Sequence, residues 1–257
     1  MISEMPRPVA EAVQRPTTRF VPAKTNEQLD LQALHRVRSR LVSERTAVIN
    51  QIRGFLLERS IIVRQGLRFL RQALPDILAK RTDVLSPRMA RIVADLASDW
   101  RQLDERIEAV TDEIKTLAKS DDSCRRVMTV PGIGPIISSA MVAAIGSGAA
   151  FARARDFSAW IGLVPKQMST GDRTILGRIS KRGNSYLRTL FMQAARVILL
   201  RRASWPKHGF GIWLAHAAQR LHPNVLAAAL ANKLARIAWT VLAQQRAYEA
   251  RITKAAA

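Results

Sequence analysis

Three glycine-containing stretches in the second half of the chain bring hydroxyl groups and cations together, and these are side chains that bind phosphate esters or react with them. The middle stretch, 166–173, contains Ser169 together with Lys166 and Arg173. A serine hydroxyl can attack phosphorus when nearby cations stabilise the charge that develops on the phosphoryl oxygens. All histidines are distant in sequence, and no obvious His/Asp triad accompanies Ser169. From composition alone, a residue of an ordinary exposed turn is the simpler interpretation.

The last stretch, 176–184, places Arg178, Ser180, Lys181 and Arg182 just before a glycine and an asparagine that can cap a helix. Cations that lead into a helix N-terminus suit a phosphate, because backbone N–H groups there point outward and the helix dipole favours an anion. The alternative is a solvated loop followed by a cap. Ser180 is the fallback candidate for a nucleophile.

The first stretch, 131–135, reads Pro-Gly-Ile-Gly-Pro between two apolar segments of helical character. It resembles the hairpin of a helix-hairpin-helix motif. Gly132 and Gly134 would let the backbone approach a phosphate, and N–H groups at the start of the next helix would donate to its oxygens. Such a contact positions a duplex without reading its bases. The alternative is a tight turn between packed helices.

The chain carries a net charge of +21 over 257 residues, with a pI of about 11.5. The excess is concentrated in residues 151–257, which contain 18 Lys and Arg but only 3 Asp and Glu. So much positive charge repels itself unless a polyanion neutralises it. Nucleic acid is therefore the first expected partner and an anionic membrane surface the second, and the C-terminal half is expected to contact it.

The basic half offers little to a metal ion or to stacked bases. Its only carboxylates are Asp156, Asp172 and Glu249, whereas a two-metal site needs several carboxylates that converge. Aromatic residues make up 5% of the chain, too few for a base-stacking platform. We therefore expect no metal or other cofactor bound by this chain. The tryptophans expected in the core instead are Trp160, Trp205, Trp213 and Trp239.

The cysteine content and the termini indicate a cytoplasmic protein. Cys124 is the only cysteine, which excludes an intramolecular disulfide and a thiolate metal cluster and favours a reducing compartment. We expect it to be a small, partly buried side chain. The N-terminus has no apolar signal-peptide region. Residues 127–152 carry no charge, but their prolines and glycines argue against a membrane span.

The elements that must position these residues are mainly α-helical. Residues 1–25 are proline-rich and irregular, with a short edge strand expected at 20–22. Residues 26–120 have the periodicity of long helices, and residues 121–257 form a basic domain of helices and glycine turns. Strand signals are weak throughout. Asn184 is predicted to cap a helix of the basic domain, and the segment 222–224 is predicted to start its last helix.

Two long amphipathic helices are predicted within 26–120. Thr25 or Asn26 can cap the first, Ser86 can cap the second, and Pro75 is expected to start a new turn between them. The apolar stripe of the first comprises Leu34, Val37, Leu41, Val48, Ile52 and Phe55. A heptad seam in the second, with a gap at Trp100, comprises Met89, Ile92, Leu96, Leu103, Ile107, Val110, Ile114 and Leu117. The seam fits an antiparallel coiled-coil hairpin, an intermolecular coiled coil or a bundle face.

Together these stretches resemble the insertion-sequence transposases related to the pilin-gene invertase, known as the one-ten family of bridge-RNA-guided recombinases. The similarity covers roughly residues 16–245. It rests on five strings in combination: 15–22, 131–135, Trp-Ile-Gly-Leu-Val-Pro at 160–165, Ser-Thr-Gly at 169–171, and 176–183.

The resemblance implies DNA transposition by serine-mediated phosphodiester transesterification. Members of the family carry an N-terminal RuvC-like domain with metal-binding acidic residues, then a coiled coil and a domain with a nucleophilic serine, which would be Ser169 here. DNA, a guide RNA and Mg²⁺ in intact relatives are implied. So is a site shared between subunits, with the coiled coil joining a second copy or a full-length transposase. The residues expected to bind DNA are Gly132, Gly134, Lys166, Arg173, Arg178, Lys181 and Arg182.

The sequence departs from the family pattern at its start, because it begins just before the inter-domain segment and shows no RuvC-like strands or acidic residues. We therefore expect a truncated or split transposase. One alternative is a non-catalytic remnant that binds DNA or RNA and joins full-length transposase assemblies. Another is a structural helical protein whose positive charge is incidental.

Overall fold

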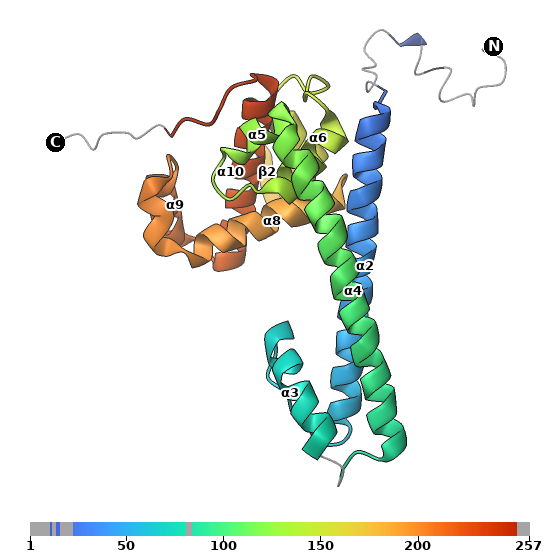
Figure 1. The fold of residues 1–257 in the computed structure, drawn as a ribbon. Helices are drawn as coiled ribbons and strands as arrows, with labels where there is room; N and C mark the ends of the chain where they lie inside the picture. Colours follow the sequence, from blue (N-terminus) through green and yellow to red (C-terminus); the bar gives the residue numbers. More distant parts are fainter. Residues whose placement is uncertain (1–10, 12–13, 16–22, 81–83, 251–257) are drawn as a thin grey trace. The chain divides into compact units, whose positions relative to one another are not determined.

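The computed structural model describes residues 11, 14–15, 23–80 and 84–250. As predicted, the chain is mainly α-helical, with one two-stranded sheet in the part that is described (Figure 1). It divides into two compact units, the first formed by residues 1–30 and 118–257 and the second by residues 31–117. The edge strand expected at 20–22 and the family-like string at 15–22 lie outside the described residues, apart from Arg15.

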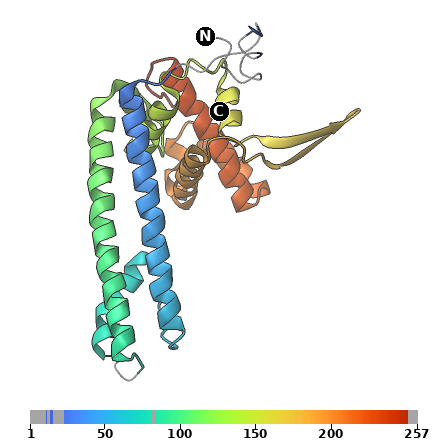
Figure 2. The ribbon, with the colours of Figure 1, turned by 90° about the vertical axis from the view of Figure 1, so that its right-hand side faces the viewer.

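The second unit is built from α2 (Asn26–Leu57), α3 (Leu67–Lys80) and α4 (Pro87–Ser120), of which residues 31–117 belong to it. Figures 1 and 2 show α2 and α4 side by side and antiparallel. The caps form as predicted. The hydroxyl of Thr25 accepts from the N–H of Gln28 at 3.2 Å, and that of Ser86 accepts from the N–H of Met89 at 3.3 Å.

The buried faces of these helices differ in detail from the predicted stripes. Val37 and Leu117 are 39% and 42% exposed, so these two assignments were wrong. Trp100, predicted to be a gap in the seam, is buried. Pro75 lies inside α3 and does not start a new turn. The apolar cluster shared by the three helices comprises Ile49, Ile52, Leu56, Ile61, Leu70, Leu74, Ile77, Leu85, Val93, Ala97 and Trp100.

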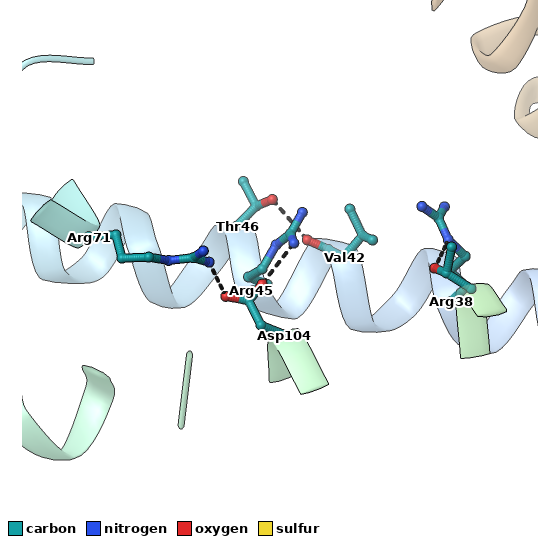
Figure 3. A network of polar contacts seen from close by, with 7 residues as sticks. Arg38, Val42, Arg45, Thr46, Arg71 and Asp104 are labelled. Atoms are coloured by element: carbon teal, nitrogen blue, oxygen red, sulfur yellow. Dashed lines mark hydrogen bonds and ion pairs between the residues drawn. The ribbon is translucent and has the colours of Figure 1, made fainter. Parts of the chain in front are cut away.

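Polar contacts connect α2 to its neighbours in the second unit (Figure 3). The carboxylate of Asp104 pairs with Arg45 at 2.9 Å and with Arg71 at 2.5 Å. Arg38 donates to the hydroxyl of Thr111 at 2.8 Å. These contacts run antiparallel along α2 and α4, so they fix the register of the two helices.

The first unit holds α5 (Asp122–Met128), α6 (Pro135–Ile145), α7 (Ala154–Trp160), α8 (Ser185–Leu200), the 3-10 helix η1 (Arg202–Lys207), α9 (Gly211–Arg220) and α10 (Pro223–Ala243). As predicted, Asn184 caps α8 and the last helix, α10, starts within 222–224; His222 is its cap. Cys124 is buried, as expected. Trp205 is buried, but Trp160 is 38% exposed and was wrongly assigned to the core.

Helix α10 is the central helix of this unit. It packs against α8, α7 and α5, and its buried side chains include Leu226, Leu230, Leu234 and Val241. In the described chain it is the one helix long and apolar enough to cross a membrane, and half of its apolar window is buried in the protein. Helix α10 is apolar because it packs in the core of this unit.

Candidate nucleic-acid interface

A β-hairpin carries the middle stretch predicted to do chemistry. Strands β1 (Pro165–Thr170) and β2 (Arg173–Ile179) pair antiparallel around Gly171 and Asp172, and Figure 2 shows the hairpin extending away from the helices of its unit. The prediction of a loop here was wrong. Every residue of β1 is exposed, and in β2 only the last is partly buried. With neither face in a core, the strands lack the apolar–polar alternation that reveals a strand in sequence.

The base of the hairpin is fastened by backbone hydrogen bonds between the two segments that flank it, 160–164 and 180–184. The N–H of Ser180 donates to the carbonyl of Val164 at 2.8 Å. The N–H of Lys181 donates to the carbonyl of Gly162 at 3.1 Å. A two-stranded ribbon is marginally stable by itself, so these contacts hold it in place on the helices.

Two glycines make this close approach possible. Gly162 and Gly183 have φ of +73° and +77°, a conformation that side chains other than glycine rarely adopt. A Cβ at Gly162 would overlap the backbone of Arg182, and a Cβ at Gly183 would overlap the carbonyl oxygen of Trp160. Both positions therefore require glycine, and this explains a glycine in each of two strings that carry the family resemblance.

Arg188, which the sequence analysis missed, joins the same two segments from helix α8. Its Nη1 donates to the carbonyl of Ile161 at 2.9 Å and to that of Arg182 at 3.1 Å. With Lys181 and Arg196 it lines a cleft of about 230 Å³ between the hairpin base and α8. Arg188 and Arg196 lie eight residues apart and thus share a helix face. The spacing of these two arginines does not identify a site in the sequence, because the cleft forms only where α8 lies beside the hairpin base.

Ser169 lies near the tip of the hairpin and is exposed. The side-chain amide of Gln167 donates to its Oγ at 2.8 Å. Its cross-strand partner is Thr174, so one face of the ribbon presents two hydroxyl groups and an amide. These groups can orient a phosphate ester by hydrogen bonds.

The cations of the middle stretch do not share this face. Side chains alternate between the faces of a strand, and Thr170 pairs with Arg173. Lys166, Thr170 and Arg173 therefore lie on the face opposite to Ser169. Arg173 directly precedes Thr174, the cross-strand partner of Ser169.

The other predicted residues of the last stretch lie at or next to the hairpin base. Arg178 is exposed near the end of β2. Ser180 is half-buried, while Lys181 and Arg182 are exposed. Lys181 has a φ of +57°. All the predicted residues between 166 and 182 therefore belong to one continuous element, the hairpin with its base.

The turn at 131–135 lies elsewhere in the first unit. Gly132 has a φ of +81°, and a Cβ there would meet Cδ1 of Ile198 at 2.7 Å. Packing against the end of α8 thus explains this glycine. Gly134 caps α6 and faces open space. Arg188 and Ile198 are ten residues apart on α8, about 15 Å by the rise of an α-helix. The structure does not place this turn at the hairpin base, and its phosphate contact stays a prediction.

Within the first unit, the described cations that follow residue 128 have no carboxylate partner. Among the described residues from 129 to 250, no ion pair forms. The residues that the structure describes also contain no group of three or more His, Cys, Asp and Glu that could hold a metal ion. The arrangement is thus a basic helical unit with an exposed ribbon, and such a surface is suited to a polyanion.

The fold and surface define a mainly helical protein with a basic unit, and comparisons with known proteins identify the family to which such a protein can be assigned. Residues 124–209 match the family described as "Transposase IS116/IS110/IS902 family". The chain is 42% identical to "Transposase for insertion sequence element IS1111A" of Coxiella burnetii, over 93% of this chain and 66% of that protein. It is 39% identical to "Transposase for insertion sequence element IS1328" of Yersinia enterocolitica, over 92% of this chain and 70% of that protein.

The chain belongs to the IS116/IS110/IS902 family of transposases. It spans about two thirds of the length of the curated relatives that it matches.

Proposed function

We propose that this chain acts in DNA transposition, with the hairpin and its basic base contacting DNA and Ser169 attacking a DNA phosphate. The observation that carries the proposal is the position of Ser169 in a member of this family: its hydroxyl is exposed on a projecting hairpin and held by Gln167 at 2.8 Å. The absence of ion pairs among described residues 129–250 supports a polyanionic partner.

The reaction would be a transesterification that conserves the number of phosphodiester bonds. The Oγ of Ser169 forms a bond to phosphorus, and the bond from phosphorus to one sugar oxygen breaks. The serine proton is lost to solvent, and the departing sugar oxygen takes up a proton. The products are a serine-linked DNA strand and a free sugar hydroxyl. Attack on that linkage by the hydroxyl of another strand would release Ser169 and join the DNA.

Arg173 would have to reach around the edge of the ribbon to stabilise the phosphoryl oxygens in this step, because it lies on the face opposite to Ser169, next to the cross-strand partner Thr174. Lys181, Arg188 and Arg196 would hold the neighbouring backbone in the cleft along α8. Mg²⁺ does not fit the residues that the structure describes, because no acidic cluster forms among them.

A second candidate function is DNA or RNA binding without chemistry. It is favoured by the alternation of the hairpin, which puts Lys166 and Arg173 on the face opposite to Ser169. In this case the chain would join assemblies of full-length transposase and compete for their nucleic acid. Binding would then be as strong in Ser169→Ala as in the original chain, and it would weaken steeply as salt is added.

Covalent trapping separates the two candidates. The chain is incubated with a pool of duplexes of random sequence that carry suicide nicks, and protein-linked DNA is recovered under denaturing conditions. We expect an adduct that protease removes and that Ser169→Ala abolishes. Thr174→Val, which removes the neighbouring hydroxyl, and Ser180→Ala serve as controls and should leave the adduct intact.

The outcomes distinguish the nucleophiles as well as the functions. An adduct lost in Ser180→Ala but kept in Ser169→Ala would assign the role to the fallback serine. Failure to form any adduct, with binding to the same duplexes unchanged, would favour the non-catalytic candidate. Failure to bind DNA or RNA even at low salt would contradict both and favour a structural protein.

Assembly through the helices at 26–120 is part of the same proposal. Val37 and Leu117 are partly exposed apolar side chains on these helices and suit contact with a second copy or with a longer transposase. Light scattering that compares the mass of the full chain with that of Val37→Glu measures the association of copies. The basic surface does not distinguish DNA from RNA, so competition between duplex DNA and structured RNA tests the guide-RNA partner.

A further inference from the structure

A cavity of about 480 Å³ in the first unit takes no part in the proposed transposition site. Helix α10 forms one wall, the segment before α9 forms a second, and the chain after α10 forms a third. The side chains that matter for its chemistry are Phe210, Lys233, Arg236, Ile237, Arg246 and Tyr248. No residue of the hairpin or of its base lines it.

The third wall is held in place by hydrogen bonds. The chain turns back after α10 at Gln245, which has a φ of +51°. The N–H of Arg246 then donates to the carbonyl of Val241 at 3.3 Å, and the N–H of Tyr248 donates to the hydroxyl of Thr129 at 2.8 Å. The cavity is therefore built by tertiary contacts, since these residues come from distant parts of the sequence.

Three cations and one carboxylate line the cavity. Lys233 and Arg236 lie one turn apart on α10, and Arg246 reaches the cavity from the returning chain. Glu249 is the carboxylate on the wall, and within the described part of the chain none of these three cations forms an ion pair. An anion in the cavity would relieve their mutual repulsion.

Lys233 contacts an aromatic ring that does not line the cavity: its ammonium lies 4.7 Å from the ring centre of Trp213, a favourable cation–π contact. Burial, and next the charge of Arg236, lower the pKa of Lys233. Such a group gains from a negatively charged ligand, because the ligand stabilises the protonated form.

The remaining lining determines what sort of anion fits. Phe210, Ile237 and Tyr248 provide apolar and aromatic surface next to the cations. The cavity volume lies within the usual range of about 300–1,000 Å³ for pockets that bind small organic ligands. The cavity is therefore larger than a bare phosphate requires. A ligand with a phosphate at one end and a flat, weakly polar body at the other matches both parts.

We propose that this cavity binds one nucleotide unit, with its phosphate on Lys233, Arg236 and Arg246 and its base against the wall formed by Phe210, Ile237 and Tyr248. The nucleotide is either free or part of a single strand, since both present the same chemistry. The site goes beyond the proposed transposition function and does not rest on Ser169.

Calorimetric titration of the full chain with adenosine monophosphate tests the proposal. We expect saturable binding at one site, and binding weakened about tenfold or more in Lys233→Met and in Arg246→Gln, because each removes a charge-assisted contact. Arg246 is exposed and outside any helix, so its replacement keeps the fold even if that of Lys233 does not. Arg220→Gln, which removes an exposed cation at the end of α9, is the matched control and should bind normally.

Three further arms identify the ligand class and separate this site from the hairpin. Adenosine should bind much more weakly than its monophosphate, and binding of inorganic phosphate equal to that of the nucleotide would overturn the proposal. If a single-stranded oligoadenylate also binds, and Arg246→Gln weakens its binding to the same extent, the site takes a nucleotide within a strand. If the oligoadenylate does not bind, the site takes free nucleotide. Ser169→Ala should leave the titration unchanged. No saturable binding of the monophosphate, or equal loss in Arg220→Gln, contradicts the site.

Discussion

The two units of this protein use their charged residues in opposite ways. In the second unit, Asp104 bonds Arg45 and Arg71, and Arg53 donates to the carbonyls of Val63, Arg64 and Gly66 at 2.8–3.1 Å. In the first unit, the cations from residue 129 to residue 250 of the described chain form no ion pair. Charge in the second unit is thus part of the structure, whereas in the first unit the described cations after residue 128 have no carboxylate partner, although Arg188 holds backbone carbonyls.

This difference gives a rule for reading a basic sequence. Net charge alone says that a polyanion is a suitable partner, but the distribution of counterions says which part of the chain meets it. Removing charge from the second unit should cost stability and leave binding intact. Removing charge from the first should cost binding and leave stability intact. Three predictions test the contrast, from the largest change in stability to the smallest.

Protonation of the buried His35 should cause the largest loss of stability, because it adds a positive charge inside the second unit. Burial, and next the charge of Arg38, lower the pKa of His35 from 6.5 to about 4. The unfolded chain then binds more protons than the folded one between these two values. Stability is therefore full above pH 6.5 and is lost as the pH falls, by about 3 kcal/mol at pH 4. Hydrogen exchange of the α2 amides near residue 35 measures this loss.

The variant His35→Gln is the control for that measurement. It should remove this part of the pH dependence while the carboxylates of the unit titrate as before. An NMR titration that finds the His35 imidazole protonating near pH 6.5 in the folded protein would contradict the prediction.

Removing one carboxylate from the second unit should cause the next largest loss of stability. Asp104→Asn leaves Arg45 and Arg71 facing each other without their counterion, at a site where the Arg45 and Asp104 side chains are 21% and 24% exposed. We expect a loss of about 2 kcal/mol, between the values for exposed and buried pairs, measured by the same hydrogen-exchange method. Asp112→Asn, whose partner Lys115 is exposed, should cost less than about 0.5 kcal/mol. Equal losses in both variants would refute the contrast.

Removing two cations from the first unit should have the smallest effect on stability. The double variant Lys181→Gln/Arg182→Gln should change the unfolding free energy by less than about 0.5 kcal/mol. Its affinity for duplex DNA should fall, and the slope of log affinity against log salt should decrease by up to about 2. The matched control, Arg40→Gln/Arg59→Gln in the second unit, should leave the slope unchanged. A loss of slope in this control would show that both units bind.

The sequence predicts those parts of the fold that local chemistry determines. Thr25, Ser86 and Asn184 were predicted as helix caps, and all three accept the expected backbone hydrogen bonds. A cap needs only its own side chain and the N–H groups that follow it, so three or four neighbouring residues are enough to reveal it.

Features that depend on distant segments escaped the sequence analysis. The hairpin was missed because its strands have no buried face, although Gly171 and Asp172 are typical of a turn. Val37 was assigned to the wrong face of α2 because the stripe was read without knowledge of the neighbouring helices. Arg188 and Arg196 gain their significance only from the hairpin base that lies beside them. The candidate serine was found through family resemblance, since an exposed serine on a ribbon has no distinctive local signal.

The contacts at Gly162 and Gly183 attach the hairpin at its base, so this attachment does not depend on how long the strands are. Residues inserted at the tip would not touch these contacts, so the reach of the arm is free to vary while the helices stay unchanged. Each added residue extends a strand by about 3.3 Å, and only additions in pairs keep each side chain on its original face. Relatives whose arms differ by an even number of residues per strand should therefore present the same face to their partners at a different depth, and engineered arms can follow the same rule.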